Sequence, residues 1–170
     1  YPRTSSRYLS KDMVPQLGGL MKNLTEIDEY AEISKKIVDK GIKTNKRIVD
    51  DTKVTDHHAI IPTDKKATLK NLTADELKIF DLVIKRFLSV FLDECKKHQT
   101  DIVTTFGANK FKTSGIIIKE QGWREVYLKD TDIKDDESDK KLPDVAKGDT
   151  VNQKDLKLEE KQTKPPALYN

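Results

Sequence analysis

The residues after position 72 carry the pattern that most constrains the fold. Thr73-Ala74-Asp75-Glu76 has the form of a capping box, in which a hydroxyl and a carboxylate satisfy free N–H groups at a helix start. Behind it, apolar side chains recur at three- and four-residue steps, as on one face of a helix: Leu77, Phe80, Val83, Ile84, Phe87 and Phe91. The pattern predicts a helix from residue 74 to about Cys95 at the centre of a core, and we interpret its aromatic stripe as packing.

The preceding residues also indicate helices. Ser10 is a candidate N-cap, Pro15 can open a second helix, and Gly18-Gly19 weakens the helical pattern locally. A further helix is predicted to end at Gly41, because glycine commonly follows the last helical turn. One face of that helix is predicted to be apolar, with Ile27, Tyr30, Ala31, Ile37 and Val38.

After His98 the apolar period changes from that of a helix to that of a strand. Residues 102–106 and 111–118 read as two strands joined by a hairpin turn at 107–109. Trp123 and residues 126–128 are expected to begin another segment against the same sheet, and residues 150–158 a returning strand. Residues 129–141 are almost all charged or polar, which predicts a mobile solvated loop. The fold class is therefore predicted as α+β, with a helical domain over 1–97 and an antiparallel β-rich domain over 98–170.

Composition narrows the class of protein. The chain is 35% hydrophobic and 36% charged, and its net charge of +3 is too small to indicate a nucleic-acid partner by itself. Cys95 is the only cysteine, so no internal disulfide can form and a reducing cytosol is the natural compartment. No apolar run approaches the length of a membrane span, and the amino terminus lacks an apolar signal core. The absence of an initial Met favours a fragment of a longer protein.

The first residues combine a phenol with two guanidinium groups. Tyr1 is followed by Arg3 and Arg7, and Thr4, Ser5 and Ser6 lie between the arginines. A phenol can attack phosphorus, and arginine can hold the phosphate oxygens. Because an ordinary tyrosine is only about 0.1% ionised at pH 7, such a nucleophile needs nearby cations or a base. The residues alone also allow a disordered terminus with surface charges.

Tyr8 and the paired histidines leave further alternatives. Tyr8 competes with Tyr1 for the nucleophile's role on chemistry alone, although packing or stacking suits it better. His57 and His58 are adjacent, so on an extended segment they point in opposite directions. No Cys or third His lies near them with zinc-ligand spacing, which argues against a metal site. Each is either a structural histidine or a hydrogen-bonding group for a reacting phosphate.

Five segments together resemble one protein family. Tyr1-Pro2-Arg3-Thr4-Ser5-Ser6-Arg7-Tyr8-Leu9 resembles the nucleophile motif of type IA DNA topoisomerases of the topoisomerase III branch, and Asp56-His57-His58-Ala59-Ile60-Ile61-Pro62-Thr63 resembles their D-H-H-A-I-I-P-T signature. Three later segments are also similar to motifs of these enzymes: residues 111–115, 142–149 and 163–167. Ser5 stands where the family usually has aspartate, so no role of that aspartate is carried over.

The resemblance implies a function and site residues. Tyr1 would attack a phosphodiester of single-stranded DNA to form a 5′-phosphotyrosyl link, Arg3 would position the scissile phosphate, and His57 would contact it. Weaker candidates for DNA contact are Thr4, Ser6, Arg7 and His58. The fold implied is a winged-helix-like gate domain on a β arch around a hole. The parent would be a bacterial cytoplasmic, nucleoid-associated isomerase that needs no ATP and has no membrane or small-molecule partner.

The resemblance also implies that this chain is incomplete for activity. The family's Mg²⁺ is held by an acidic D-x-D-x-E cluster, of which this sequence has no convincing equivalent, so the ligands are expected outside the chain and none within it. The isolated chain is therefore expected to be inactive. The rival readings are a non-catalytic DNA-binding module of the same fold and a protein-interaction domain whose basic surface is incidental.

Overall fold

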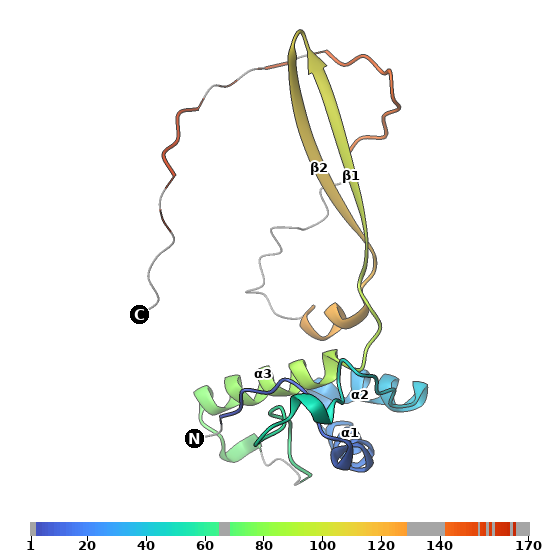
Figure 1. The fold of residues 1–170 in the computed structure, drawn as a ribbon, viewed down its shortest axis with the longest axis vertical. Coiled ribbons are helices and arrows are strands. Elements are labelled where there is room, and N and C mark those ends of the chain that lie inside the picture. The colour runs from blue at the N-terminus through green and yellow to red at the C-terminus, as the bar shows by residue number, and fades with distance from the viewer. Residues whose placement is uncertain are drawn as a thin grey trace.

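A helical body carries a long, two-stranded hairpin (Figure 1). The computed structural model describes residues 3–64, 69–128 and 142–152, and beyond these 154, 155, 157, 159–163 and 165. Its α-helices are α1 (Leu17–Leu24), α2 (Asp28–Lys40) and α3 (Ala74–Ser89), its strands β1 (Lys96–Phe106) and β2 (Asn109–Glu120), and its 3-10 helices η1 (Lys11–Gln16), η2 (Asp51–Lys53), η3 (Leu69–Asn71) and η4 (Gly122–Tyr127). The predicted α+β class is confirmed.

Helix α3 forms as its capping box predicts. Thr73 Oγ1 accepts from the Glu76 N–H at 3.3 Å, and Glu76 Oε2 accepts from the Thr73 N–H at 2.7 Å. These bonds satisfy N–H groups that lack partners within the helix. On the predicted face, Ile84 and Phe87 are buried, whereas Leu77 is 37% exposed. The other members are partly buried: Phe80, Val83 and Phe91. The prediction that the helix runs to about Cys95 was wrong, because it ends at Ser89 and the chain then turns toward β1.

The first helices differ from prediction in where they begin. Ser10 lies at the N-cap of η1 but makes no side-chain capping bond, and Pro15 lies inside η1 rather than opening a helix. Helix α1 begins at Leu17 and includes Gly18 and Gly19. A β-carbon at either glycine would meet nothing within 4 Å, so both lie away from the packed face. Burial of four apolar side chains on the other face of α1 offsets their weak helix propensity.

Helix α2 ends at Gly41 as predicted, with a φ of +78° at that glycine. Tyr30 and Ile37 are buried, but Val38 is 44% exposed, so its assignment to the apolar face was wrong. Ser34 is fully buried in its place. Positions 30, 34 and 37 follow the helical steps of four and three residues, whereas position 38 drifts from that face.

The core joins all three α-helices. Its buried side chains are Leu9, Leu17, Leu20, Met21, Leu24, Tyr30, Ile37, Ile48, Ile84, Phe87, Leu88 and Val126. At its edge, the Tyr30 hydroxyl donates to Asp81 Oδ1 at 2.8 Å, and Lys85 Nζ lies 2.7 Å from Asp81 Oδ2. The Lys85 side chain is 10% exposed, so this carboxylate stabilises both a hydroxyl and a desolvated cation.

We expect Asp81→Ala to lower the free energy of unfolding by about 2 kcal/mol, because hydrogen bonds to a charged group are lost at a partly buried position. Glu94→Ala is the control, since Glu94 pairs with Arg47 at 3.2 Å where both side chains are over 80% exposed. Such a pair contributes less than about 0.5 kcal/mol. Urea unfolding measures both variants, and equal losses would contradict this role for Asp81.

The hairpin is confirmed and is longer than predicted. Antiparallel pairing runs from Phe106 opposite Asn109 at the turn to Lys96 opposite Glu120 at the base. Gly107 has a φ of +57°, a conformation that glycine adopts without the penalty that a β-carbon brings. Most hairpin side chains are exposed, and among the described residues the sheet has two strands. The predicted domain boundary near residue 97 stays a prediction; β1 begins one residue before it.

The segment after β2 returns to the helices. Trp123 and residues 126–128 were predicted to lie against the sheet, and that was wrong: they belong to η4 or its end, which contacts α3. Val126 enters the core, and Glu125 forms an ion pair with Lys36 of α2. The Trp123 N–H also bonds to the Asp93 carbonyl at 2.9 Å. Burial of Val126 against helices outweighs the strand propensity of the Val126-Tyr127-Leu128 run.

The last third of the chain is described only in part. A turn is observed at 147–148, one residue before the Gly148-Asp149 turn that the sequence indicates, with the Asp149 N–H 3.2 Å from the Ala146 carbonyl. The predicted strand over 150–158 is wrong for those of its residues that are described, since none has strand structure. The predicted loop at 129–141 lies outside the described residues, as does most of the predicted exit at 164–166. Within the described ranges, no helix is long and apolar enough to cross a membrane.

Candidate functional site

The amino-terminal segment runs beside residues 48–59. The Leu9 N–H donates to the Ile48 carbonyl at 2.8 Å, and the Asp50 N–H donates to the Leu9 carbonyl at 3.0 Å. One residue earlier, the Tyr8 carbonyl accepts from the Ala59 N–H at 2.8 Å. Tyr8 and Leu9 are 9% and 4% exposed, so their burial anchors the segment. The two motifs, more than forty residues apart in sequence, therefore form one surface.

Two hydroxyls join these segments further. Thr4 Oγ1 donates to the His57 carbonyl at 3.1 Å and accepts from the Ser6 N–H at 3.1 Å. Ser6 Oγ donates to the Lys53 carbonyl at 2.9 Å and accepts from the Tyr8 N–H at 3.1 Å. Each hydroxyl has one proton, which here goes to a carbonyl. In this conformation Thr4 and Ser6 position backbone, and their predicted contact with DNA stays a prediction.

We expect Thr4→Val to release the amino-terminal segment from residue 57 while Thr4→Ser retains it, because only valine removes the bridging hydroxyl. The loss should be about 1 kcal/mol of local stability. Amide hydrogen exchange at Ser6 measures it, since that N–H bonds to Thr4 Oγ1. Unchanged protection in Thr4→Val would show that the bond does not hold the segment.

The predicted arginines and histidines lie on or near this joined surface. Arg3, Arg7 and His57 are exposed, and His58 is partly buried with Nδ1 2.6 Å from the Ala59 carbonyl. That contact fits a protonated Nδ1, which leaves Nε2 as the free ring atom. Within the described ranges, no carboxylate pairs with Arg3 or Arg7 at salt-bridge distance, so both can bind an anion. Tyr1 lies outside the described residues, so its predicted approach to His57 stays a prediction.

Tyr8 has an environment that the sequence did not reveal. Its hydroxyl oxygen accepts from Arg7 Nη2 and from Lys53 Nζ, each at 3.2 Å. Lys53 Nζ also lies 4.7 Å from the ring centroid, within the range of a cation–π contact. The hydrogen bond from Arg7, followed by that from Lys53, lowers the pKa of Tyr8, because both cations stabilise the phenolate. Lys53 is 45 residues away in sequence, so spacing gave no signal for this contact.

Further basic residues lie within or near the histidine-bearing segment in sequence: Arg47, Lys53, Lys65 and Lys66. Arg47 pairs with Glu94, whereas Lys53 joins Tyr8. Lys65 and Lys66 lie outside the described residues.

Across the part of the chain that the structure describes, no three His, Cys, Asp or Glu side chains lie together as metal ligands would. The described residues therefore do not fit a magnesium site.

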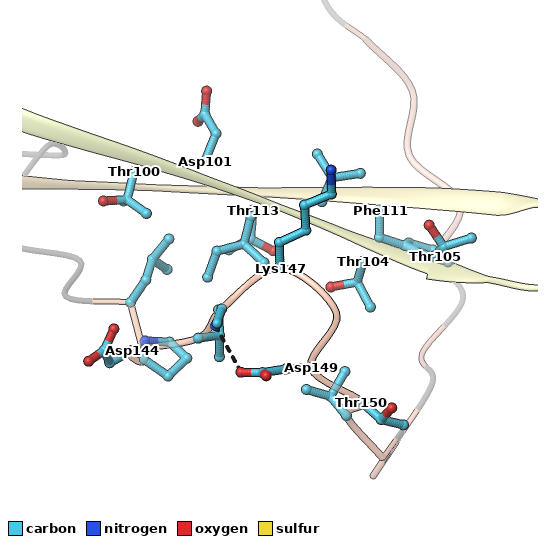
Figure 2. Close-up of a pocket in the computed structure, with 18 of the residues that line it drawn as sticks. Thr100, Asp101, Thr104, Thr105, Phe111, Thr113, Asp144, Lys147, Asp149 and Thr150 are labelled. Atoms are coloured by element: carbon cyan, nitrogen blue, oxygen red, sulfur yellow. Dashed lines mark hydrogen bonds between the residues drawn. The ribbon is translucent and has the colours of Figure 1, made fainter.

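A separate hollow lies along the hairpin. Figure 2 shows it between the strands and residues 142–151, with Thr100 and Thr104 of β1 pointing toward that segment. Its volume is about 1320 Å³, and Ala146 N–H to Asp149 Oδ2 at 2.8 Å closes the facing turn. None of the predicted site residues lines it. The hollow is thus distinct from the surface formed by residues 3–9 and 48–59.

Comparison with known proteins agrees with the motifs on that surface. A family model for DNA topoisomerase matches residues 1–170. The chain is 40% identical over its whole length to DNA topoisomerase 3 of Bacillus licheniformis and of Bacillus subtilis, and 42% identical to that of Bacillus thuringiensis. It spans only 23–24% of the length of these relatives. The chain belongs to the DNA topoisomerase family, in the branch that these topoisomerase 3 enzymes represent.

Proposed function

We propose that the protein containing this chain cleaves and rejoins one strand of DNA through Tyr1 and passes another strand through the break. Family membership supports the reaction class, and one structural observation carries the site: the bond from Thr4 to the main chain of His57. It joins the segment that bears Tyr1 and Arg3 to the histidine motif. A phosphate bound at Arg3 would thus lie on the surface that also carries His57.

The residues divide the chemistry between them. The Tyr1 hydroxyl oxygen forms a bond to phosphorus as the bond from phosphorus to the 3′ oxygen breaks, and the departing oxygen takes up a proton to become a 3′-hydroxyl. Arg3 stabilises the charge on the phosphate oxygens. His57 donates a hydrogen bond to the reacting phosphate or helps to move the proton. Rejoining is the reverse attack by the 3′-hydroxyl.

No ATP is needed in this scheme, because one phosphodiester is exchanged for another and the bond energy is conserved. Magnesium would supply electrostatic support for rejoining. The family resemblance implies that its ligands lie in parts of the protein beyond this chain, and no step here depends on it. The same reasoning predicts that the isolated chain does not relax DNA.

The exposed surface supports a single strand as the substrate. Arg3 and Arg7 are exposed, and the neighbouring hydroxyls and histidines can approach a flexible backbone without needing a duplex groove. Ser6, Thr4 and His58 are further candidates for backbone contact. The hairpin, which projects from the helical body, suits part of an arch around the passing strand (Figure 1). A bacterial, nucleoid-associated location follows from this function.

Covalent capture with end-labelled DNA tests the proposal. The full-length protein is mixed with a single-stranded oligonucleotide labelled at either end, and then denatured with detergent. A 5′-phosphotyrosyl link predicts that the 3′-end label stays with the protein and the 5′-end label is released on a strand with a free 3′-hydroxyl. The opposite pattern would reverse the polarity, and no capture of either label would leave only a DNA-binding module.

A further inference from the structure

We propose that Tyr8 is a positioning residue that holds Arg7 and Lys53 together as a clamp for one backbone phosphate of DNA. Lys53 thereby becomes a further DNA-binding residue. This inference rests on the proposed function for its substrate, single-stranded DNA. It concerns binding beside the reacting phosphate, and assigns no part of the bond-breaking step to Tyr8.

The geometry brings two cations to one oxygen. Arg7 Nη2 and Lys53 Nζ both donate to the Tyr8 hydroxyl at 3.2 Å, so the two nitrogens can lie no farther apart than twice that distance. Arginine and lysine normally repel at short range. Here the partial negative charge of the phenol oxygen and ring face lies between them, as the lowered pKa of Tyr8 reflects. A phosphate, with several acceptor oxygens, suits such a pair of donors.

Tyr8 is held firmly enough by its neighbours to position both cations. The residue is only 9% exposed, its N–H bonds to Ser6 Oγ, and its carbonyl accepts from the Ala59 N–H. Lysine and arginine lose much rotamer freedom when they bind an anion. Tyr8 already restricts the guanidinium of Arg7 and the ammonium of Lys53. Part of the rotamer entropy is therefore lost before DNA binds, and the affinity for DNA is higher as a result.

Lys53 is fixed from its own side as well. It ends η2, its carbonyl accepts from Ser6 Oγ, and its ammonium lies 3.7 Å from Asp50. Asp50 also accepts from Thr52 N and Oγ1 at 3.2 and 2.7 Å, and these bonds, that from the Thr52 side chain first, lower its pKa. Asp51, the next carboxylate, pairs with Lys11 instead. Among the described residues, Asp50 is thus the one carboxylate that pairs with either Lys53 or Arg7, and the clamp keeps a net positive charge.

The clamp is also accessible. Arg7 is exposed, and the Lys53 side chain is 53% exposed. Both belong to the surface where Thr4 contacts residue 57. A strand held at Arg3 and His57 would therefore meet these cations on the same surface, which suits a neighbouring phosphate rather than the reacting one.

The test measures equilibrium binding of a single-stranded oligonucleotide by the full-length protein that carries Tyr1→Phe, so that no cleavage contributes. Lys53→Gln should reduce the slope of log affinity against log salt by about 0.7, the value for one phosphate contact on a single strand. Lys53→Arg should restore it. Lys78→Gln is the control, because Lys78 lies on α3 and pairs with Asp75 at 3.1 Å.

Tyr8→Phe separates positioning from structure. It retains the ring and both charges but removes the shared oxygen, so affinity should fall about threefold to tenfold. Combined with Lys53→Gln, it should weaken binding much less than the product of the two single effects, because both act on one clamp. Urea unfolding reports any loss of stability. An unchanged salt slope in Lys53→Gln, or a less stable Tyr8→Phe protein with unchanged affinity, would overturn the proposal.

These results are independent of the proposed strand cleavage. If the wild-type protein captures DNA covalently but Lys53→Gln binds with an unchanged salt slope, the clamp fails and the function stands. If no covalent capture occurs but the slope falls in Lys53→Gln, the clamp stands and the cleavage proposal fails.

Discussion

Replacement of Tyr1 by phenylalanine is expected to reduce covalent attachment of DNA by on the order of 10³-fold or more, as removal of a nucleophile does in other enzymes. Phenylalanine retains the ring but lacks the oxygen that bonds to phosphorus. Non-covalent affinity should change little, because the arginines and histidines that are proposed to contact phosphate remain. The measurement is the amount of end-labelled oligonucleotide that stays with the full-length protein after denaturation, beside an equilibrium binding curve for each protein.

Two other tyrosines make this result decisive. Tyr127→Phe should form the adduct at the wild-type level, because Tyr127 packs against Trp123 in η4 with ring centroids 6.0 Å apart. Tyr8→Phe should still form the adduct at saturating DNA even though it binds more weakly. An adduct that survives Tyr1→Phe and disappears in Tyr8→Phe would transfer the nucleophile's role to Tyr8, whose pKa is already lowered by Arg7 and Lys53.

Elements stabilised by neighbours in sequence were predictable. The capping box at Thr73 and Glu76 begins α3 because both partners lie within one turn. The hairpin follows from alternation on each side of Gly107, which needs no knowledge of the rest of the fold. The end of α3 was not predictable in the same way. Apolar spacing continues to Phe91, beyond the observed end of the helix at Ser89, so the pattern carries no stop signal.

Elements stabilised by distant partners were misassigned. Val126, Tyr127 and Leu128 form an apolar run that suggested a strand, yet η4 packs on α3. Val126 completes a core built from residues more than thirty positions earlier. Ser34 was not predicted as a buried residue, because a small polar residue is not part of an apolar pattern. In α2 it lies four residues after Tyr30 and three before Ile37, on the same buried face.

In the candidate site, too, local motifs were predictable and contacts between distant residues were not. Motif similarity identified Tyr1, Arg3 and His57 as site residues, and their roles stay predictions. Motif similarity did not predict the contacts that join the two motifs. Hydroxyls proposed as phosphate donors in Thr4 and Ser6 instead bond to carbonyls of residues 57 and 53. Such bonds depend on how two loops are placed in space, and a linear pattern does not encode that.

Gly122→Ala is expected to lower the free energy of unfolding by roughly 3 kcal/mol or more, because steric overlap and backbone strain act together there. Gly122 has a φ of +53°, a region that is unfavourable for a residue with a β-carbon. A β-carbon would also lie 2.5 Å from the carbonyl oxygens of Asp93 and Glu94. Backbone cannot move aside as a flexible side chain does, and the neighbouring bond from Trp123 N–H to Asp93 would be strained as well.

Substitutions at two other glycines separate the effect of steric overlap on stability from that of backbone strain. Gly107→Ala has the same backbone strain, with a φ of +57°, but open space around the added carbon, so it should lose only about 1 kcal/mol. Gly18→Ala lies in α1 with open space and no positive φ, and should gain up to about 1 kcal/mol from helix propensity. Denaturant unfolding ranks the three variants. If Gly122→Ala and Gly107→Ala lose equal stability, close packing between Gly122 and the backbone of Asp93 and Glu94 does not anchor the base of the hairpin. If the order holds, the contact of Gly122 with residues 93–94 is the point where the base of the hairpin is fixed.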